Sequence, residues 1–159
     1  MDINYGDYPY VTSSETLPYS ACSLGFSPKK IKDIIGVAKI YDTKSGVDPL
    51  FPESLWNDEH LNKIIELGKE FGSTTGRKRI VNWLRLNHLR QAIKISGTNK
   101  LIINKCDILQ QINKYKIITD DKNGPNHIDF INFNSMKEYI INELKDYCDI
   151  IFSGNKEKI

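Results

Sequence analysis

Three long segments carry apolar residues three and four positions apart, which is the spacing of a helix with one buried face. The first begins at a cap on Asn57 or Asp58 and ends near Phe71. The second ends at Ser96-Gly97, and the third follows a capping box that starts at Ser135. The apolar faces of these predicted helices comprise Leu61, Ile64, Ile65 and Gly68; Leu86, Leu89, Ala92 and Ile93; and Met136, Tyr139, Ile140, Leu144 and Tyr147.

Shorter apolar, aromatic or β-branched runs lie between these segments and predict strands. They cover residues 8–12, 37–43, 101–103, 115–119 and 149–152. A short helix is expected from Ser27-Pro28 to Gly36 and a single helical turn at 108–112, whereas 44–53 and 120–127 are expected to be loop or exposed excursion. Helices that alternate with short strands predict an α/β fold with a largely parallel sheet and flanking helices. The length predicts one domain with one core over residues 1–159.

Composition and charge exclude several classes of protein. With 40% apolar and 26% charged residues, the chain lies outside the range of disordered sequences. A net charge of +2 gives no reason to expect binding to nucleic acid or to a membrane surface. No apolar run reaches the length of a membrane span. The cysteines Cys22, Cys106 and Cys148 have neither zinc nor disulfide spacing, which indicates a reducing compartment. We therefore expect a cytoplasmic protein with no nucleic-acid or membrane partner.

One short motif indicates a base-binding site. Asn104-Lys105-Cys106-Asp107 has the form NKxD and directly follows the predicted strand 101–103. An aspartate can accept two parallel hydrogen bonds from N1–H and the exocyclic amine of guanine, and adenine presents no such donor pair. The lysine stem can cover the flat face of the ring. In α/β sheets, ligands bind beyond the carboxyl ends of strands, where Ser153-Gly154 also lie.

A flexible basic loop, Gly72 to Arg79, precedes the second predicted helix. It combines hydroxyls, two glycines and the arginines Arg77 and Arg79, whose forks suit phosphate and carboxylate oxygens. An anion-binding loop and an ordinary solvated basic turn both fit this composition. Near the start, Thr12-Ser13-Ser14 fits either a capped turn or a phosphate contact.

Five blocks of the chain resemble the adenylosuccinate synthetase family, in the family's order. They are DINYGDYPYVTSS at 2–14, TKSGVDP at 43–49, FGSTTGRKR at 71–79, NKCDIL at 104–109 and IFSG at 151–154. The family joins IMP and L-aspartate at the cost of GTP, which yields adenylosuccinate, GDP and phosphate. The resemblance implies a layered sheet like that of P-loop NTPases, present here without its N-terminal strands. It also implies Mg²⁺ for the complete enzyme and a homodimer.

The resemblance implies a binding role for each matching position. For IMP these are Thr12, Ser45, Gly46 and Arg77. For aspartate they are Ser73, Thr74, Thr75, Gly76, Arg77, Lys78 and Arg79. For GTP, as a substrate, they are Arg79, Lys105, Cys106, Asp107, Phe152, Ser153 and Gly154.

The sequence also departs from the family pattern. It holds no GxxxxGK-type phosphate loop, so we expect no catalytic residue and no Mg²⁺ ligand within it. Glu15 replaces an expected asparagine, and Leu17 to Leu24 lacks the usual glycine-rich run. We therefore expect little or no adenylosuccinate formation by this chain alone, and activity only if a separate chain supplies the N-terminal half.

Three alternatives remain open at this point. The chain could be a degenerate GTP- or IMP-binding fragment without catalysis. It could belong to a related synthetase that acts on a 2-aminopurine nucleotide. A nucleic-acid binder is the weakest alternative, because Arg77 and Arg79 form only a local cluster.

Overall fold

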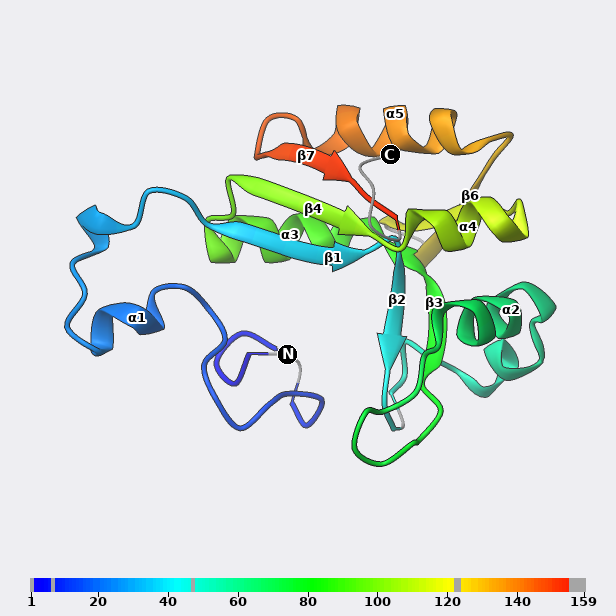
Figure 1. Cartoon of the computed structure of the whole chain (residues 1–159), viewed down its shortest axis with the longest axis horizontal. Helices are drawn as coiled ribbons and strands as arrows, with labels where there is room; N and C mark the ends of the chain where they lie inside the picture. The colour runs from blue at the N-terminus through cyan, green and yellow to red at the C-terminus, as the bar shows by residue number, and fades with distance from the viewer. Residues whose placement is uncertain (1, 7, 47, 122–123, 155–159) are drawn as a thin grey trace.

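The strands form two sheets that meet where β1 passes into β2 (Figure 1). This computed structural model describes residues 2–6, 8–46, 48–121 and 124–154. The first sheet is parallel and has the order β1-β4-β7, from β1 (Ile35–Lys39), β4 (Lys100–Asn104) and β7 (Asp149–Phe152). The second is mixed and has the order β2-β3-β5-β6, from β2 (Tyr41–Lys44), β3 (Ile80–Arg85), β5 (Tyr115–Asp121) and β6 (Gly124–Phe130). The predicted α/β class is confirmed, although only the first sheet is parallel throughout.

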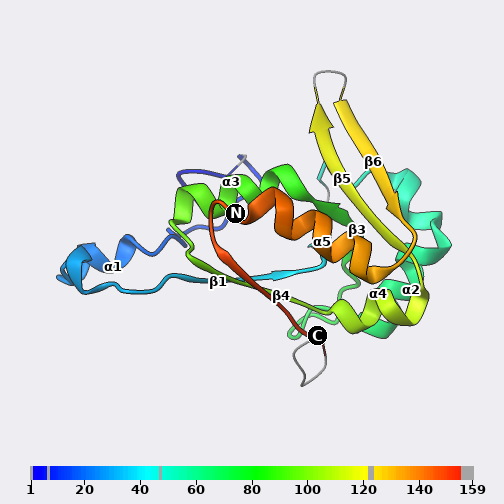
Figure 2. The same cartoon turned by 90° about the horizontal axis from the view of Figure 1, so that it is seen from above.

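The longer helices are α2 (Glu59–Gly68), α3 (Leu86–Ser96), α4 (Cys106–Ile112) and α5 (Phe133–Leu144). Short helical segments are α1 (Ser20–Ser23), η1 (Pro28–Lys30) and η2 (Glu53–Asn57). Figure 2 shows α3 and α5 on one side of the parallel sheet. Leu101 and Ile103 of β4 are buried, whereas Val37 of β1 and Ile151 of β7 are 66% and 38% exposed. Strand side chains alternate between faces, so the helices cover one face of this sheet and leave the other open.

The three predicted amphipathic helices are confirmed, and their ends show the chemistry that stops them. Asp58 caps α2 by accepting a hydrogen bond from the Leu61 amide at 3.0 Å. Gly97 ends α3 in the left-handed conformation, with φ 70°. The third helix differs in detail. Asn132 is the N-cap of α5 and Ser135 is its third residue, so the helix begins before the predicted box and ends at Leu144.

The expected helix from Ser27 to Gly36 is wrong. Only η1 is helical there, and Ile35 already belongs to β1. Distant partners explain the difference, since the Ile34 amide donates to Asn99 Oδ1 at 2.8 Å and its carbonyl accepts from the Asn99 amide at 3.1 Å. Long-range pairing of the backbone overrides the local helical spacing.

The strand predictions have mixed outcomes. Strands at 101–103, 115–119 and 149–152 are confirmed, and the run 37–43 is divided between β1 and β2. The strand expected at residues 8–12 is wrong, because these residues form turns and bends. The excursion expected at 120–127 does project from the body in its described part, but it does so as a hairpin of β5 and β6, whose strand pairing was not predicted (Figure 2). Strand β3 was not predicted, because α3 begins at the very next residue and no turn residue separates the two elements.

Candidate functional site

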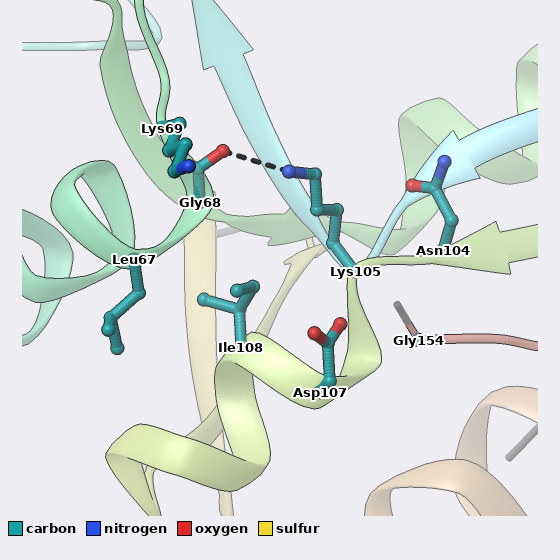
Figure 3. A pocket seen from close by; sticks show the side chains of 8 residues that line it. All are labelled: Leu67, Gly68, Lys69, Asn104, Lys105, Asp107, Ile108 and Gly154. Atoms are coloured by element: carbon teal, nitrogen blue, oxygen red, sulfur yellow. Dashed lines mark hydrogen bonds between the residues drawn. The ribbon is translucent and has the colours of Figure 1, made fainter. Parts of the chain in front are cut away.

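The loops that follow β4 and β7 lie side by side, as the sequence predicted. The Cys106 amide donates to the Ser153 carbonyl at 3.1 Å, and the Ser153 amide donates to the Ile103 carbonyl at 2.9 Å. A pocket of about 410 Å³ opens beside these loops and the end of α2 (Figure 3). Its lining residues are Leu67, Gly68, Lys69, Asn104, Lys105, Asp107, Ile108 and Gly154. We call this the first pocket.

Lys105 forms one wall of the first pocket in an unusual backbone conformation. Its φ of 64° and ψ of 20° place it in the left-handed region, which costs a non-glycine residue about 1 kcal/mol. Its ammonium donates to the Gly68 carbonyl at 2.8 Å, which fixes the side chain across the pocket (Figure 3). The carbonyl belongs to the last residue of α2, where helical carbonyls lack an internal partner. The extended stem of Lys105 is therefore held as an apolar surface beside the pocket.

Asp107 points into the space between Lys105 and Gly154 from the first turn of α4 (Figure 3). Its Oδ1 atom is buried and has no hydrogen-bond partner among the described residues, and the same holds for Asn104 Oδ1. A buried acceptor without a donor costs about 1–3 kcal/mol, so native proteins rarely leave one unpaired. Two such oxygens in one pocket indicate a ligand that carries hydrogen-bond donors.

Not every residue of the two loops faces the first pocket. Cys106 is 0% exposed, its thiol donates to the Ile103 carbonyl at 3.3 Å, and burial raises its pKa to about 12. Phe152 is 2% exposed and packs edge-on against Phe133, with the ring centroids 6.1 Å apart. Both side chains therefore belong to the core. Gly154, in contrast, lines the pocket directly.

A second pocket of about 670 Å³ lies at the end of β2. It brings together Pro9, Tyr10, Val11, Thr43, Lys44, Ser45 and Arg79. Two of the predicted residues, Ser45 and Arg79, thus meet although 34 positions separate them. Thr12 follows directly in the chain and bonds to the Ser14 carbonyl at 3.0 Å, and Gly46, with φ 91°, follows Ser45.

Lys44 is a member of this second pocket that was not predicted. Its ammonium donates to the Tyr10 carbonyl at 3.2 Å and pairs with Asp48 at 3.2 Å. It therefore ties the N-terminal segment to β2, and Asp48 balances its charge. A lysine inside the block TKSGVDP was the available signal, but no spacing rule distinguishes it from a surface lysine.

The basic loop closes on itself. The Gly72 amide donates to the Arg77 carbonyl at 2.8 Å, and the Gly76 amide donates back to the Gly72 carbonyl at 2.8 Å. Gly76 has φ 62°, which a side chain would disfavour. The residues from Ser73 to Lys78 are exposed, and Lys78 reaches Asn62 Oδ1 at 3.2 Å. Arg79, at the end of the loop, is the loop residue that lines the second pocket.

The described residues offer neither a cluster of metal-ligating side chains nor a helix that could span a membrane. In residues 2–6, 8–46, 48–121 and 124–154, no group of three or more His, Cys, Asp and Glu side chains is placed to hold a metal ion. In the same part of the chain, no helix combines the length and apolarity that crossing a membrane requires.

Comparisons with curated proteins point to one family. The sequence model of the family adenylosuccinate synthetase matches residues 1–146. The adenylosuccinate synthetase of Petrotoga mobilis is 44% identical over 119 residues, which is 75% of this chain and 28% of the relative. That of Thermodesulfovibrio yellowstonii is 45% identical over 125 residues, covering 78% of this chain and 29% of the relative. The chain thus spans less than a third of the length of these relatives.

Solved structures show the same likeness in three dimensions. A fully ligated adenylosuccinate synthetase from Plasmodium falciparum superposes with a TM-score of 0.78 at 25% identity, over 95% of this chain and 44% of that one. The succinoaminodeoxyadenylate synthetase of cyanophage S-2L, bound to dGMP and dATP, gives a TM-score of 0.57 at 12% identity, over 95% of this chain and 39% of that one, which shows a shared fold. The predicted P-loop-like layered arrangement is confirmed by the first of these. This chain belongs to the adenylosuccinate synthetase family.

Proposed function

We propose that this chain supplies guanine recognition and substrate binding for adenylosuccinate synthesis, in which IMP, L-aspartate and GTP give adenylosuccinate, GDP and phosphate. One observation carries the proposal. Asp107 presents a buried, unpaired carboxylate oxygen to a pocket at the carboxyl edge of a parallel sheet. Family membership supports the reaction, and this geometry supports the role of the segment within it.

In the proposed complex, guanine occupies the first pocket. Asp107 accepts hydrogen bonds from N1–H and the 2-amino group of the base, which satisfies its unpaired oxygen. The stem of Lys105, fixed by the Gly68 carbonyl, covers one face of the ring. Gly154 leaves room at the opposite side, since it carries no side chain. We propose that Cys106, Phe152 and Ser153 support the base through their backbone and packing.

The second pocket and the basic loop receive IMP and aspartate in this proposal. Thr12, Ser45, Gly46 and Arg77 serve IMP, and residues 73–79 close over aspartate. Lys44 and Arg79 line the second pocket and are paired with Asp48 and Glu70. In this proposal the Arg79 guanidinium contacts both aspartate and the phosphate groups of GTP. Gly72 and Gly76 give the loop the backbone freedom that closure in such a role requires.

We assign no residue of this chain to phosphoryl transfer. In the family that step uses GTP with Mg²⁺, whose charge stabilises the transferring group. The proposed contribution of this chain is to select and hold the reactants, and residues 1–159 do so as one domain. Adenylosuccinate is formed when a second chain, or the same polypeptide continued, supplies the phosphate cradle. A homodimer of the assembled enzyme is consistent with the family.

Titration calorimetry with GTP, ITP and ATP tests the proposed function on the chain as it stands. ITP lacks the 2-amino group, so we expect it to bind about tenfold more weakly than GTP. ATP offers neither donor to Asp107, so we expect it to bind about a hundredfold more weakly. Equal affinities for the three nucleotides would show that the pocket does not recognise guanine.

A further inference from the structure

Glu70, which no sequence pattern singled out, is the most enclosed acidic side chain around the two pockets. It is 2% exposed, and three donors reach its carboxylate. Lys39 Nζ lies 2.7 Å from Oε2, Arg79 Nη1 lies 3.1 Å from the same oxygen, and the Tyr41 hydroxyl lies 2.9 Å from Oε1. Buried carboxylates normally have hydrogen-bond partners, and two of the three donors to Glu70 are cations.

The donors come from parts of the chain that the fold brings together. Lys39 ends β1, Tyr41 begins β2, and Arg79 ends the basic loop. The backbone of Glu70 adds a fourth contact, since its carbonyl accepts from the Arg79 amide at 2.9 Å. Arg79 is thus held through both its main chain and its side chain. Lys39 is held as well, because it also donates to Thr43 Oγ1 at 3.2 Å.

The charges explain why Glu70 acts as an anchor. Burial by itself would raise the pKa of the carboxyl, but the donors Lys39, Tyr41 and Arg79 outweigh it and hold the pKa below its ordinary value. The group is therefore an anion facing two cations. An arginine in such a contact keeps one guanidinium edge fixed and leaves the others for a ligand. Arg79 meets this description, because it also lines the second pocket.

The position of Glu70 also relates the two pockets. It follows Gly68 by two residues, and the Gly68 carbonyl is the group that fixes Lys105 in the first pocket. The bond to Lys105 uses the backbone of Gly68, whereas the bond to Arg79 uses the side chain of Glu70. A change confined to the Glu70 carboxylate should therefore leave the first pocket in place and release Arg79.

We propose that Glu70 is a positioning residue that holds the Arg79 guanidinium ready for the phosphate groups of a nucleotide whose base occupies the first pocket. The inference rests on the proposed function, in which Arg79 contacts GTP. It adds that Arg79 is placed for this contact by a buried carboxylate, which itself touches no ligand. Glu70 therefore affects binding only through Arg79.

Comparing GTP with guanosine separates this role from general support of the fold. Guanosine carries the base but no phosphate, so its affinity reports on the first pocket alone. We expect Glu70→Gln, which keeps the shape and removes the charge, to weaken GTP binding about tenfold and to leave guanosine binding unchanged. In an Arg79→Ala background, Glu70→Gln should have no further effect on GTP. Glu66→Gln, at an exposed position of α2, is the matched control and should bind both ligands as the wild type does.

Nuclear magnetic resonance of the arginine side chains gives a readout without any ligand. In the wild-type chain the guanidinium N–H signals of Arg79 should be sharp and resolved, and in Glu70→Gln they should broaden as rotation is freed. Equal weakening of GTP and guanosine would overturn the proposal, as would an undiminished effect of Glu70→Gln in the Arg79→Ala background. Averaged Arg79 signals in the wild type would also overturn it, even if the variant failed to fold. If the wild-type chain bound GTP, ITP and ATP equally well while its Arg79 signals were sharp, the proposed function would be refuted instead.

Discussion

Replacing Asp107 by alanine should lower the affinity of the chain for GTP about a hundredfold. The proposed base contact consists of two hydrogen bonds to one carboxylate, and each bond to a charged group contributes about 1.5 kcal/mol or more. Their joint loss of about 3 kcal/mol corresponds to that factor in the dissociation constant. Calorimetric titration of both proteins with GTP measures it directly.

Asp146→Ala provides the control for this experiment. Asp146 is exposed in the turn after α5, so its substitution makes the same change in net charge away from the first pocket. We expect it to bind GTP as the wild type does. If Asp107→Ala bound GTP with wild-type affinity, or if both variants lost affinity equally, guanine would not be read by Asp107.

Gly68→Ala should lower the midpoint of thermal unfolding by roughly 5–10 °C. A Cβ at this position would lie 2.5 Å from the Tyr41 hydroxyl, and Tyr41 is 1% exposed. Overpacking costs about 1–3 kcal/mol, and disturbing the Tyr41 bond to Glu70 adds about 1 kcal/mol. Such a loss corresponds to several degrees in a chain of this size. Calorimetric or circular-dichroism melting measures the shift.

The sign of this effect is diagnostic, because alanine ordinarily stabilises a helix relative to glycine by about 1 kcal/mol. Glu66→Ala, at an exposed position of the same helix, is the matched control and should melt close to the wild type. A Gly68→Ala protein that melts at or above the wild-type temperature would show that Tyr41 is not packed against Gly68 as the structure has it.

The elements that the sequence predicted correctly are those whose local signals agree with their surroundings. In α2, helical spacing, the Asp58 cap and a buried apolar face all favour the same structure. The run at β4 is short, apolar and followed by a polar motif, which is typical of a buried strand. Local propensity and long-range packing do not conflict in either case.

The failures occur where distant contacts decide the structure. Ile34 has helical spacing with its neighbours, yet its backbone pairs with Asn99, 65 positions away. Strand β6 is polar along much of its length because it projects from the body, so its alternation lacks the apolar residues that identify a strand. The spacing of residues in the sequence reveals neither the pairing of Ile34 with Asn99 nor the projection of β6.

The candidate site shows the same division. The motif at Asn104 to Asp107 and its place after a strand were predictable, because both are local. Gly68, Lys44 and Glu70 were not, because each has a partner more than 30 positions away: Lys105, Tyr10 and Lys39, respectively. Sequence reasoning thus found the residues proposed to contact ligands directly and missed those that hold them in place.

Exchanging the base preference by one substitution tests the central claim most directly. Xanthine keeps N1–H but carries a 2-oxo group in place of the 2-amino group of guanine. In Asp107→Asn, the amide oxygen can accept from N1–H and the amide nitrogen can donate to the 2-oxo group. The ratio of XTP to GTP affinity is therefore the decisive quantity, measured by calorimetry for the wild type and for Asp107→Asn. We expect the wild type to favour GTP and Asp107→Asn to favour XTP, whereas an unchanged ratio would contradict guanine recognition by Asp107.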